Sequence, residues 1–386
     1  MVVRFLARFA FLSALAMPAY AESWTPAQVD RLAQWLEGAD NEALPSMDAD
    51  AVALRAAQFK GEPAVIASLA TDRALRLAFA MRYGAIPYER RTDWEIAGDG
   101  TDIDMPAALA DALVADRLDP FFGDLRPTHP YYAQLQAAYV LETDPARHAA
   151  IGTSLERWRW MPRAMTSRYL MANAATFELT LWDEGKPIER WPVVVGKEKT
   201  KTPIFTTIVT GMIFNPWWEI PSSIVAESVG AMVRNRPAEA RRKGYVFANG
   251  RYRQRPGPGN SLGQVKLVMP NSYNVYLHDS PAKALFERDV RAFSHGCIRV
   301  GNAFGMAANL LSGQTEWDMA RIDKVVASGV TTPVSLARTL PVYIVYFTAE
   351  PEGKDSVRVV PDIYERDASI IQMIPPPVLP APDGVQ

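Results

Sequence analysis

The sequence predicts an α+β fold in which a helical N-terminal part precedes a strand-rich part. Between residues 24 and 150, apolar side chains recur at helical spacing, as at Val29, Leu32 and Leu36. From Arg168 onward the pattern changes to short alternating runs separated by turn residues, which is typical of strands. The 386-residue chain is 48% hydrophobic and 22% charged, so it can bury one or two ordinary cores without disulfides.

The first residues have the pattern of an export signal. Arg4 and Arg8 precede a short apolar run over residues 9–17, and an A-x-A cleavage pattern ends at Ala21. The apolar run is too short to cross a hydrocarbon layer of ~30 Å. We therefore expect a signal peptide over residues 1–21, cleaved after Ala21.

Helices are expected in several segments of the N-terminal part, each bounded by glycine or proline. These segments are residues 29–36, 50–59, 64–83, 107–118 and 129–142. None of them carries a pattern that indicates catalysis. His129 and His148 are expected to be ordinary surface or helix-cap residues.

The strand-rich part is predicted to open with a β-hairpin whose strands, 169–182 and 188–195, flank a turn at 183–186. Further strands are expected over 207–214, 264–269, 273–278 and 342–347. Because side chains alternate along a strand, Tyr276 and His278 should share the polar face of the segment 273–278.

The stretch from Phe293 to Val300 contains the only cysteine of the protein, Cys297. A thiol is a strong nucleophile only as the thiolate, so it needs a nearby base or a positive field. Gly296 allows a tight turn that brings backbone N–H groups close to a reacting carbonyl. Arg299 would share a face with Cys297 in an extended segment. These residues indicate a cysteine acyl-transfer site.

Two other interpretations stay open from the residues alone. A lone cysteine is often a small buried hydrophobic residue. His278, Asp279, His295 and Cys297 are also all metal-ligand types, although their spacings match no common zinc pattern. In an exported protein, however, one unpaired cysteine points to a reactive thiol.

"SHGCIRV" and the upstream "YLHDS" resemble the signature of the L,D-transpeptidase (YkuD-type) catalytic domain, and in particular the large periplasmic branch of that family. Five further segments resemble the same branch, in its order: "ERWRWMP" (156–162), "VVVGKEKTKTP" (193–203), "FNPWWEIPSSI" (214–224), "PGPGNSLGQVK" (256–266) and "PVYIVYFTAE" (341–350). The resemblance covers most of residues 156–365.

The resemblance implies roles for individual residues. Cys297 would be the nucleophile, His278 the base, and the backbone carbonyl of Asp279 the group that orients the imidazole. The backbone N–H groups of Gly296 and Cys297 would hold the oxyanion. Substrate-binding roles are implied for Arg299, Tyr276, Ser294, His295, Trp217 and Trp218. His295 would also hold the loop, Arg299 could instead supply a positive field that lowers the thiol pKa, and both tryptophans are open to a core role.

The resemblance also implies a division into domains. A helical scaffold domain is expected over residues 22–155 and a mostly β catalytic domain over 156–365. A helical lid or capping insertion is expected at about 221–259, and a proline-rich extended tail over 366–386. The peptidoglycan-binding repeat that longer relatives insert in the helical region is expected to be absent, because about a dozen residues connect the two parts.

The implied function is a periplasmic enzyme that crosslinks peptidoglycan peptide stems, with diaminopimelate or L-alanine as acyl donor. The alternatives are an L,D-carboxypeptidase or an amidase with the same residues, and a wall-binding scaffold without activity. Papain-like peptidases place cysteine before histidine, and S-x-x-K is not found in the strand-rich half. Carbapenems are implied inhibitors. No cofactor or metal is expected, no protein partner is indicated, and a formal net charge of −2 does not suggest nucleic acid.

Overall fold

The computed structural model describes residues 24–98, 101–353 and 356–374. The expected signal peptide and most of the proline-rich tail lie outside this range. The α+β class is confirmed, with a helical region followed by a mostly β region. Across the described residues, none of the helices combines the length and the apolar character that crossing a membrane requires.

The chain divides into two compact units, and the division does not follow the expected boundary at residue 155. The first unit contains residues up to 39, 46–79 and 103–125, and the second contains 40–45, 80–102 and the chain from 126 onward. The expected boundary falls inside a helix, α7 (Pro145–Trp160), which belongs wholly to the second unit.

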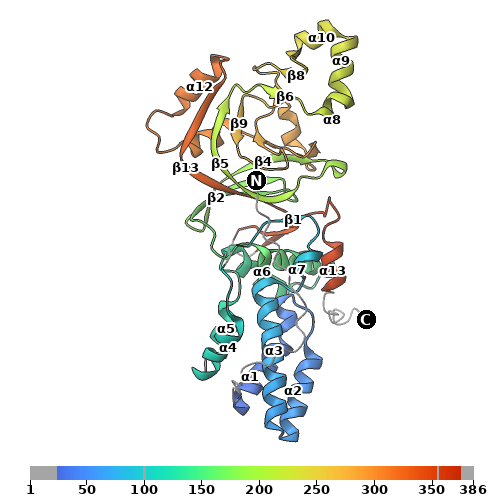
Figure 1. Ribbon diagram of the computed structural model, residues 1–386, viewed down its shortest axis with the longest axis vertical. Helices are drawn as coiled ribbons and strands as arrows, with labels where there is room; N and C mark the ends of the chain where they lie inside the picture. Colours follow the sequence, from blue (N-terminus) through green and yellow to red (C-terminus); the bar gives the residue numbers. More distant parts are fainter. Residues whose placement is uncertain (1–23, 99–100, 354–355, 375–386) are drawn as a thin grey trace, which may run out of the picture. The chain divides into compact units, whose positions relative to one another are not determined.

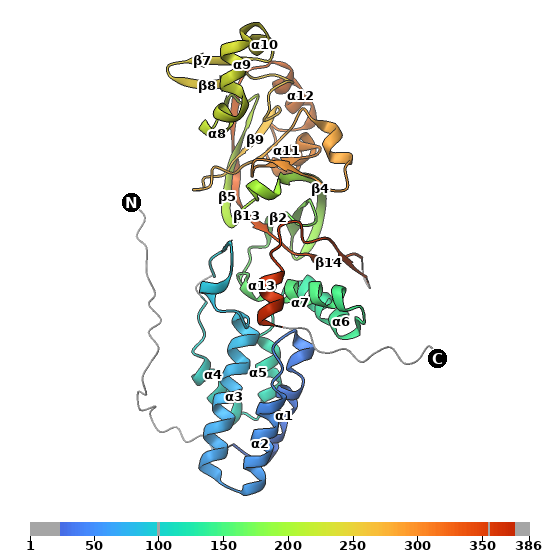
Figure 2. The ribbon, with the colours of Figure 1, turned by 90° about the vertical axis from the view of Figure 1, so that its right-hand side faces the viewer.

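The first unit is built from helices that lie alongside one another (Figure 2). They are α1 (Pro26–Glu37), α2 (Asp48–Lys60), α3 (Pro63–Tyr83, whose last residues belong to the second unit), α4 (Met105–Val114) and α5 (Leu118–Asp124). Thr25 caps α1 in a reciprocal capping box with Gln28, which satisfies two otherwise unpaired N–H groups. Leu32, Leu54 and Leu77 are fully buried, so apolar packing stabilises this unit.

A ten-stranded sheet forms the body of the second unit (Figure 1), in the order β1-β5-β13-β2-β3-β4-β12-β10-β9 with β11 beside β4. Because β9 also pairs with β5, the sheet closes on itself. The strands are β1 (Trp94–Glu95), β2 (Arg168–Asn173), β3 (Glu178–Asp183), β4 (Lys186–Gly196), β5 (Ile204–Phe214), β9 (Val265–Val268), β10 (Leu277–His278), β11 (Ala292–Ser294), β12 (Ile298–Val300) and β13 (Thr332–Val345).

The predicted hairpin across residues 183–186 is confirmed as β3–β4, with Asp183 opposite Lys186. Its first strand, expected over 169–182, is instead two strands, β2 and β3, which pair through a tight turn at 174–177. The turn is buried and contains Phe177 at a φ of 58°. It lacks the glycine and proline residues that usually mark a turn.

Helices and a short strand pair complete the second unit. They are α6 (Pro130–Leu141), α7, α11 (Ala303–Leu310), α12 (Met319–Ala327), α13 (Ala368–Met373), and the strands β14 (Ala349–Pro351) and β15 (Val357–Val359). Trp158 of α7 stacks between His129, at 4.1 Å, and Phe347, at 4.7 Å between ring centroids. Stacked aromatic rings thus join α7 to the segment that directly follows β13.

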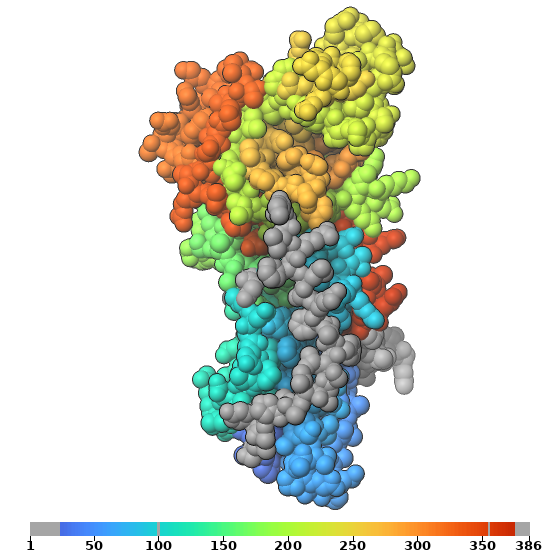
Figure 3. Space-filling view, in the orientation of Figure 1, coloured from blue at the N-terminus to red at the C-terminus, as the bar shows by residue number. Residues whose placement is uncertain are grey.

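The capping insertion is only partly helical, which corrects the expectation. It contains α8 (Ser222–Ile224), a π-helical turn (Val225–Val229), α9 (Gly230–Asn235) and α10 (Pro237–Arg242). It then forms the hairpin of β7 (Tyr245–Ala248) and β8 (Arg251–Gln254), and β8 pairs with β6 (Trp218–Glu219). Figure 3 shows the insertion as a yellow lobe that projects from the strand-rich body.

The expected tail begins too early at residue 366. Arg366 and Asp367 are buried, and α13 follows them. Asp367 accepts hydrogen bonds from Arg157 of α7 at 2.5 Å and from Thr348 at 2.6 Å, and the carbonyl of Arg366 accepts a second bond from Arg157. These contacts incorporate the segment into the second unit.

Replacing Arg157 by alanine should lower the free energy of unfolding by about 3–5 kcal/mol, because the carboxylate of Asp367 would stay buried without its cation. The measurement is urea denaturation followed by tryptophan fluorescence. Arg236→Ala is the matched control, since Arg236 forms an exposed pair with Glu239 and its removal should cost less than about 1 kcal/mol. Equal losses in both variants would contradict a buried ion pair at Arg157.

Candidate active site

The sheet register places the chemically reactive side chains on one face. In the parallel pair β10–β12, Leu277 lies opposite Ile298 and His278 opposite Arg299. The N–H of Ile298 donates to the carbonyl of Tyr276 at 2.9 Å, so the pairing extends one residue upstream. Because side chains alternate along strands, Tyr276, His278, Cys297 and Arg299 share a face. We call it the nucleophile face.

The opposite face of the same strands is apolar. Leu277, Ile298 and Val300 are fully buried there. A shift of the register by one residue would exchange the two faces and bury the thiol in the core. The apolar residues therefore determine that Cys297 points away from the core.

Cys297 follows a turn whose backbone is held by Ser294. The buried hydroxyl of Ser294 accepts a hydrogen bond from the N–H of Gly296 at 3.1 Å and donates to the carbonyl of Cys297 at 2.5 Å. Gly296 has a φ of +111°, a conformation that favours glycine. The N–H of Gly296 is thus engaged by Ser294. Its expected oxyanion role requires an N–H that is open toward the substrate, and in this structure it is not.

A second segment, residues 197–202, supports the same turn. The backbone N–H of Lys197 and the hydroxyl of Thr200 donate to the carbonyl of Ser294, at 3.0 and 3.1 Å. The hydroxyl of Thr202 donates to the carbonyl of Gly296 at 3.0 Å. The "GKEKTKTP" segment, for which the sequence indicated no role, therefore positions the nucleophile loop.

His278 is oriented by the backbone, as the resemblance implied. Its Nδ1 lies 2.5 Å from the carbonyl oxygen of Asp279, and the backbone of Leu262 is a second hydrogen-bond partner of the ring. A proton exchanged with a substrate or thiol would pass through the other ring nitrogen, Nε2. The Asp279 side chain has a different task, because it accepts from the N–H of Gln264 at 2.9 Å and pairs with Lys283 at 2.5 Å. Any side chain at Gly263 would collide with this carboxylate.

Burial dominates the electrostatics of the site. It lowers the pKa of His278 to about 4, helped by the positive charge of Arg299 and opposed by the carbonyl of Asp279. Burial also raises the pKa of the Cys297 thiol. The N–H of Tyr276 and the positive charges of Lys266 and Arg299 lower this pKa, but by less than burial raises it. A neutral thiol and a neutral imidazole are therefore the resting pair at neutral pH.

Two residues near the thiol were not singled out by the sequence. The carbonyl of Asn274 lies 3.7 Å from Cys297 Sγ, in a backbone conformation with a φ of 55°. Lys266 of β9 lies opposite His278 in the antiparallel pair β9–β10. The alternation of Val265, Lys266 and Leu267 indicates that Lys266 points away from the core. Only the pairing of β9 with β10 shows that it lies beside His278.

The remaining predicted residues are placed elsewhere. His295 lies in the turn, and its Nε2 is 2.8 Å from Oε2 of Glu227 in the capping insertion and 3.5 Å from Nζ of Lys197. Trp217 is half-buried beneath the guanidinium of Arg253, at 4.4 Å from the ring centroid. Trp218 lies in β6 and pairs with β8. Neither tryptophan belongs to the sheet that carries Cys297.

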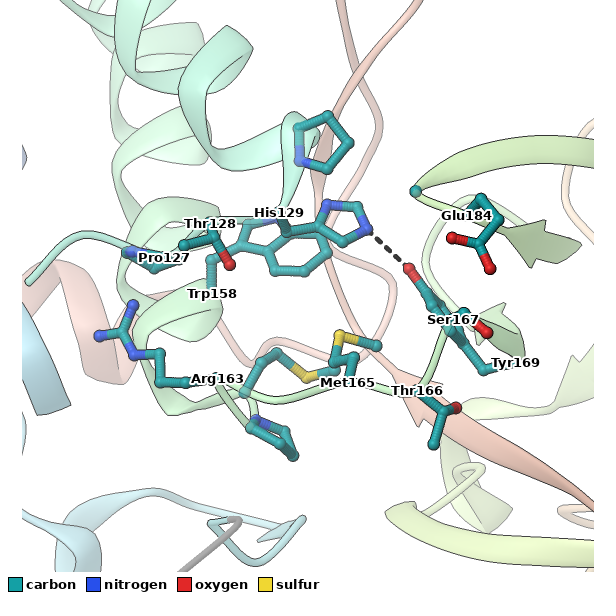
Figure 4. Close-up of a pocket in the computed structure, with 14 residues that line it drawn as sticks. Pro127, Thr128, His129, Trp158, Arg163, Met165, Thr166, Ser167, Tyr169 and Glu184 are labelled. Carbon is teal, nitrogen blue, oxygen red and sulfur yellow. Dashed lines mark hydrogen bonds between the residues drawn. The ribbon is translucent and has the colours of Figure 1, made fainter. Parts of the chain in front are cut away.

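A separate apolar pocket in the second unit is lined by rings and methionines around His129 (Figure 4). His129 Nε2 lies 2.9 Å from the hydroxyl of Tyr169, and Nδ1 accepts from the N–H of Tyr131 as the cap of α6. Burial lowers the pKa of His129 to about 3. The predicted cap role is confirmed for His129, which is half-buried. His148 is buried inside α7 instead of lying on the surface or at a cap.

The interpretation of the site as a metal centre gains no support. Within the three described segments, no group of three or more histidine, cysteine, aspartate and glutamate side chains is arranged to hold a metal ion. The Asp279 carboxylate is engaged by Gln264 and Lys283 instead.

His278 should stay neutral until the pH falls to about 4. The free chain protonates histidine near pH 6.5, so stability from this residue is present above pH 6.5 and is lost as the pH falls toward 4. Nitrogen-detected NMR of the four histidines, assigned with His278→Gln, measures the midpoint. A midpoint near 6.5 would refute the buried neutral imidazole.

Two family models match the chain. The L,D-transpeptidase catalytic domain, YkuD, matches residues 167–335, and a scaffold domain matches residues 17–138. A candidate L,D-transpeptidase of Haemophilus influenzae is 29% identical over 221 residues, which cover 52% of this chain and 45% of that protein. The chain thus spans about half the length of this curated relative.

Solved structures give weaker likenesses. An L,D-transpeptidase from Mycobacterium smegmatis is 16% identical, with a TM-score of 0.27, over 46% of this chain and 58% of that one. L,D-transpeptidase 3 from Mycobacterium tuberculosis, in complex with a faropenem-derived adduct, is 16% identical over 46% of this chain and 60% of that one, with a TM-score of 0.26. Along the chain, the scaffold match comes first and the catalytic match follows. The protein therefore has an N-terminal scaffold domain followed by a YkuD L,D-transpeptidase catalytic domain.

Proposed function

We propose that the protein is a periplasmic L,D-transpeptidase that joins peptidoglycan peptide stems through a thioester on Cys297. The observation that carries the proposal is the nucleophile face, on which one thiol and one backbone-oriented imidazole stand on adjacent paired strands. A nucleophile, a base and a group that orients the base are the minimum for covalent acyl transfer. The family match supports the same reaction class.

In the first half-reaction, Nε2 of His278 takes the proton of the Cys297 thiol as the sulfur attacks the carbonyl carbon of an L-residue in the donor stem. The C–N bond to the following D-residue then breaks. The departing amine takes the proton from the imidazolium, and a thioester remains on Cys297. The low pKa of His278 suits this cycle, because the imidazolium readily gives the proton up again.

The N–H of Cys297 is the first donor we assign to the oxyanion. The N–H of Gly296 can join it only when the hydroxyl of Ser294 turns away, because that hydroxyl accepts from it at 3.1 Å. One such donor typically lowers the barrier by about 3 kcal/mol. Formation of the oxyanion would thus compete with the internal bond of the turn.

In the second half-reaction, an amine of an acceptor stem attacks the thioester and gives its proton to His278, which restores the thiol. We assign the side-chain amine of diaminopimelate as this acceptor. Either diaminopimelate or L-alanine would supply the acyl group, giving 3-3 or 1-3 crosslinks. Water as acceptor would make the enzyme a carboxypeptidase, so transfer requires that water be excluded. The capping insertion is suited to this, since Glu227 contacts His295 beside the nucleophile.

Incubation of the protein with purified disaccharide-tetrapeptide should give crosslinked dimers, identified by mass spectrometry. Cys297→Ala should abolish them without unfolding the protein, and His278→Gln should slow them by roughly 10²–10⁴-fold. Dimers that retain one terminal D-alanine indicate 3-3 linkage, and loss of everything after L-alanine in the donor indicates 1-3 linkage. Shortened monomers alone would make the enzyme a hydrolase, and dimers from Cys297→Ala would refute the mechanism.

A carbapenem should acylate Cys297 once per chain, because its strained amide presents a carbonyl to the same nucleophile. Intact-protein mass spectrometry should show a single adduct, which Cys297→Ala lacks. Most penicillins should leave no lasting adduct. Adducts of equal lifetime from both drug classes would contradict the proposed selectivity, and an adduct on Cys297→Ala would place the reactive residue elsewhere.

A further inference from the structure

The nucleophile face carries a second cation besides Arg299. Lys266 lies opposite His278 in the antiparallel pair β9–β10, and its neighbours Val265 and Leu267 are fully buried on the other side of the strand. Since paired residues in a sheet share a face, Lys266 stands on the face of Cys297. Three adjacent strands thus bring two cations and one thiol together.

An aromatic ring holds the Lys266 side chain in place. Its Nζ lies 3.4 Å from the ring centroid of Tyr276, a cation–π contact within the favourable range. Tyr276 is itself opposite Cys297 in the parallel pairing. Burial lowers the pKa of Lys266, and the thiolate of Cys297 is the charge that opposes this effect. The ammonium lies over the Tyr276 ring, on the face of the sheet that carries Cys297.

The imidazole of His278 does not supply the positive charge that would stabilise the Cys297 thiolate in the resting enzyme. His278 is neutral at neutral pH, because its pKa is about 4. The other groups that face the thiol are Tyr276 and Arg299, and His295 in the preceding turn is turned toward Glu227. A thiolate that forms in this buried setting needs a cation that is present before proton transfer.

We propose that Lys266 is the positioning residue whose ammonium stabilises the Cys297 thiolate, with the Tyr276 ring holding it there. The proposal rests on the proposed function only in taking Cys297 as the nucleophile. It requires no particular stem, acceptor or crosslink. The positive charges of Lys266 and Arg299 both lower the pKa of the thiol, against the effect of burial.

The test is the pH profile of iodoacetamide alkylation at the single cysteine of the native full-length protein, read by intact mass. Lys266→Met removes the charge and keeps the length of the side chain. It should slow alkylation at pH 7 on the order of tenfold and move the midpoint of the profile to higher pH. Lys266→Arg should restore most of the rate. A merely structural lysine would change stability without moving the midpoint.

Lys324→Met is the matched control, since Lys324 is exposed on α12, outside the sheet, and it should leave the profile unchanged. Tyr276→Leu should shift the midpoint in the same direction as Lys266→Met. The double variant should shift it little further than Lys266→Met alone, because ring and ammonium act as one unit. Additive shifts would overturn the role of the ring.

The inference falls if Lys266→Met, folded by circular dichroism, has the wild-type profile. Should Lys266→Met fail to fold, Lys266→Arg and Tyr276→Leu carry the test: a profile that is unchanged in Tyr276→Leu overturns the proposal. The proposed function can fail separately. A shifted alkylation profile in Lys266→Met without crosslinked products from the wild type would refute the transpeptidase assignment and keep the role of Lys266. Crosslinked products with an unshifted profile would refute the role of Lys266 and keep the transpeptidase assignment.

Discussion

The parallel register between β10 and β12 is the constraint on which the site depends. Two residues of β10 and three of β12 bring together side chains that are far apart in the sequence. The register is held by apolar burial on the far side, where Leu277 and Ile298 face each other. A strand pair this short has few hydrogen bonds of its own, so β4 and β9 on either side must hold it in place.

The same arrangement sets the chemistry. Burial disfavours every charged form on this face, which keeps the thiol protonated and the imidazole neutral until a substrate arrives. A neutral pair protects the only cysteine of the protein from side reactions, because the thiol reacts far more slowly than the thiolate. Lys266 and Arg299 then lower the cost of ionisation at the moment of attack. The site thus combines low resting reactivity with local positive charge.

Much of the fold and part of the site could be predicted from the sequence. Helical spacing located α1 to α4 and α6, and the contact between His278 and the Asp279 carbonyl followed from the family motif. Other features depended on long-range pairing. Lys266 becomes part of the site only through the β9–β10 register, and the turn between β2 and β3 is apolar and carries no turn signal.

The capping insertion was expected to be helical, although its sequence contains a signal for the β7–β8 hairpin. Asn249-Gly250 is a strong hairpin signal, and both residues have positive φ in the turn between β7 and β8. The helical insertion expected at about 221–259 from the resemblance did not take this signal into account. The tail was expected to start at residue 366, and no local sequence signal contradicted this. Asp367 is held by Arg157, which lies far upstream in the sequence.

The bond between Arg157 and Asp367 spans 210 positions in the chain. Among the described residues, Asp367 is the acid that pairs with the buried guanidinium of Arg157, so this charge is balanced only once residue 367 has joined α7. The second unit is therefore completed by a contact of long sequence separation, and such contacts form slowly.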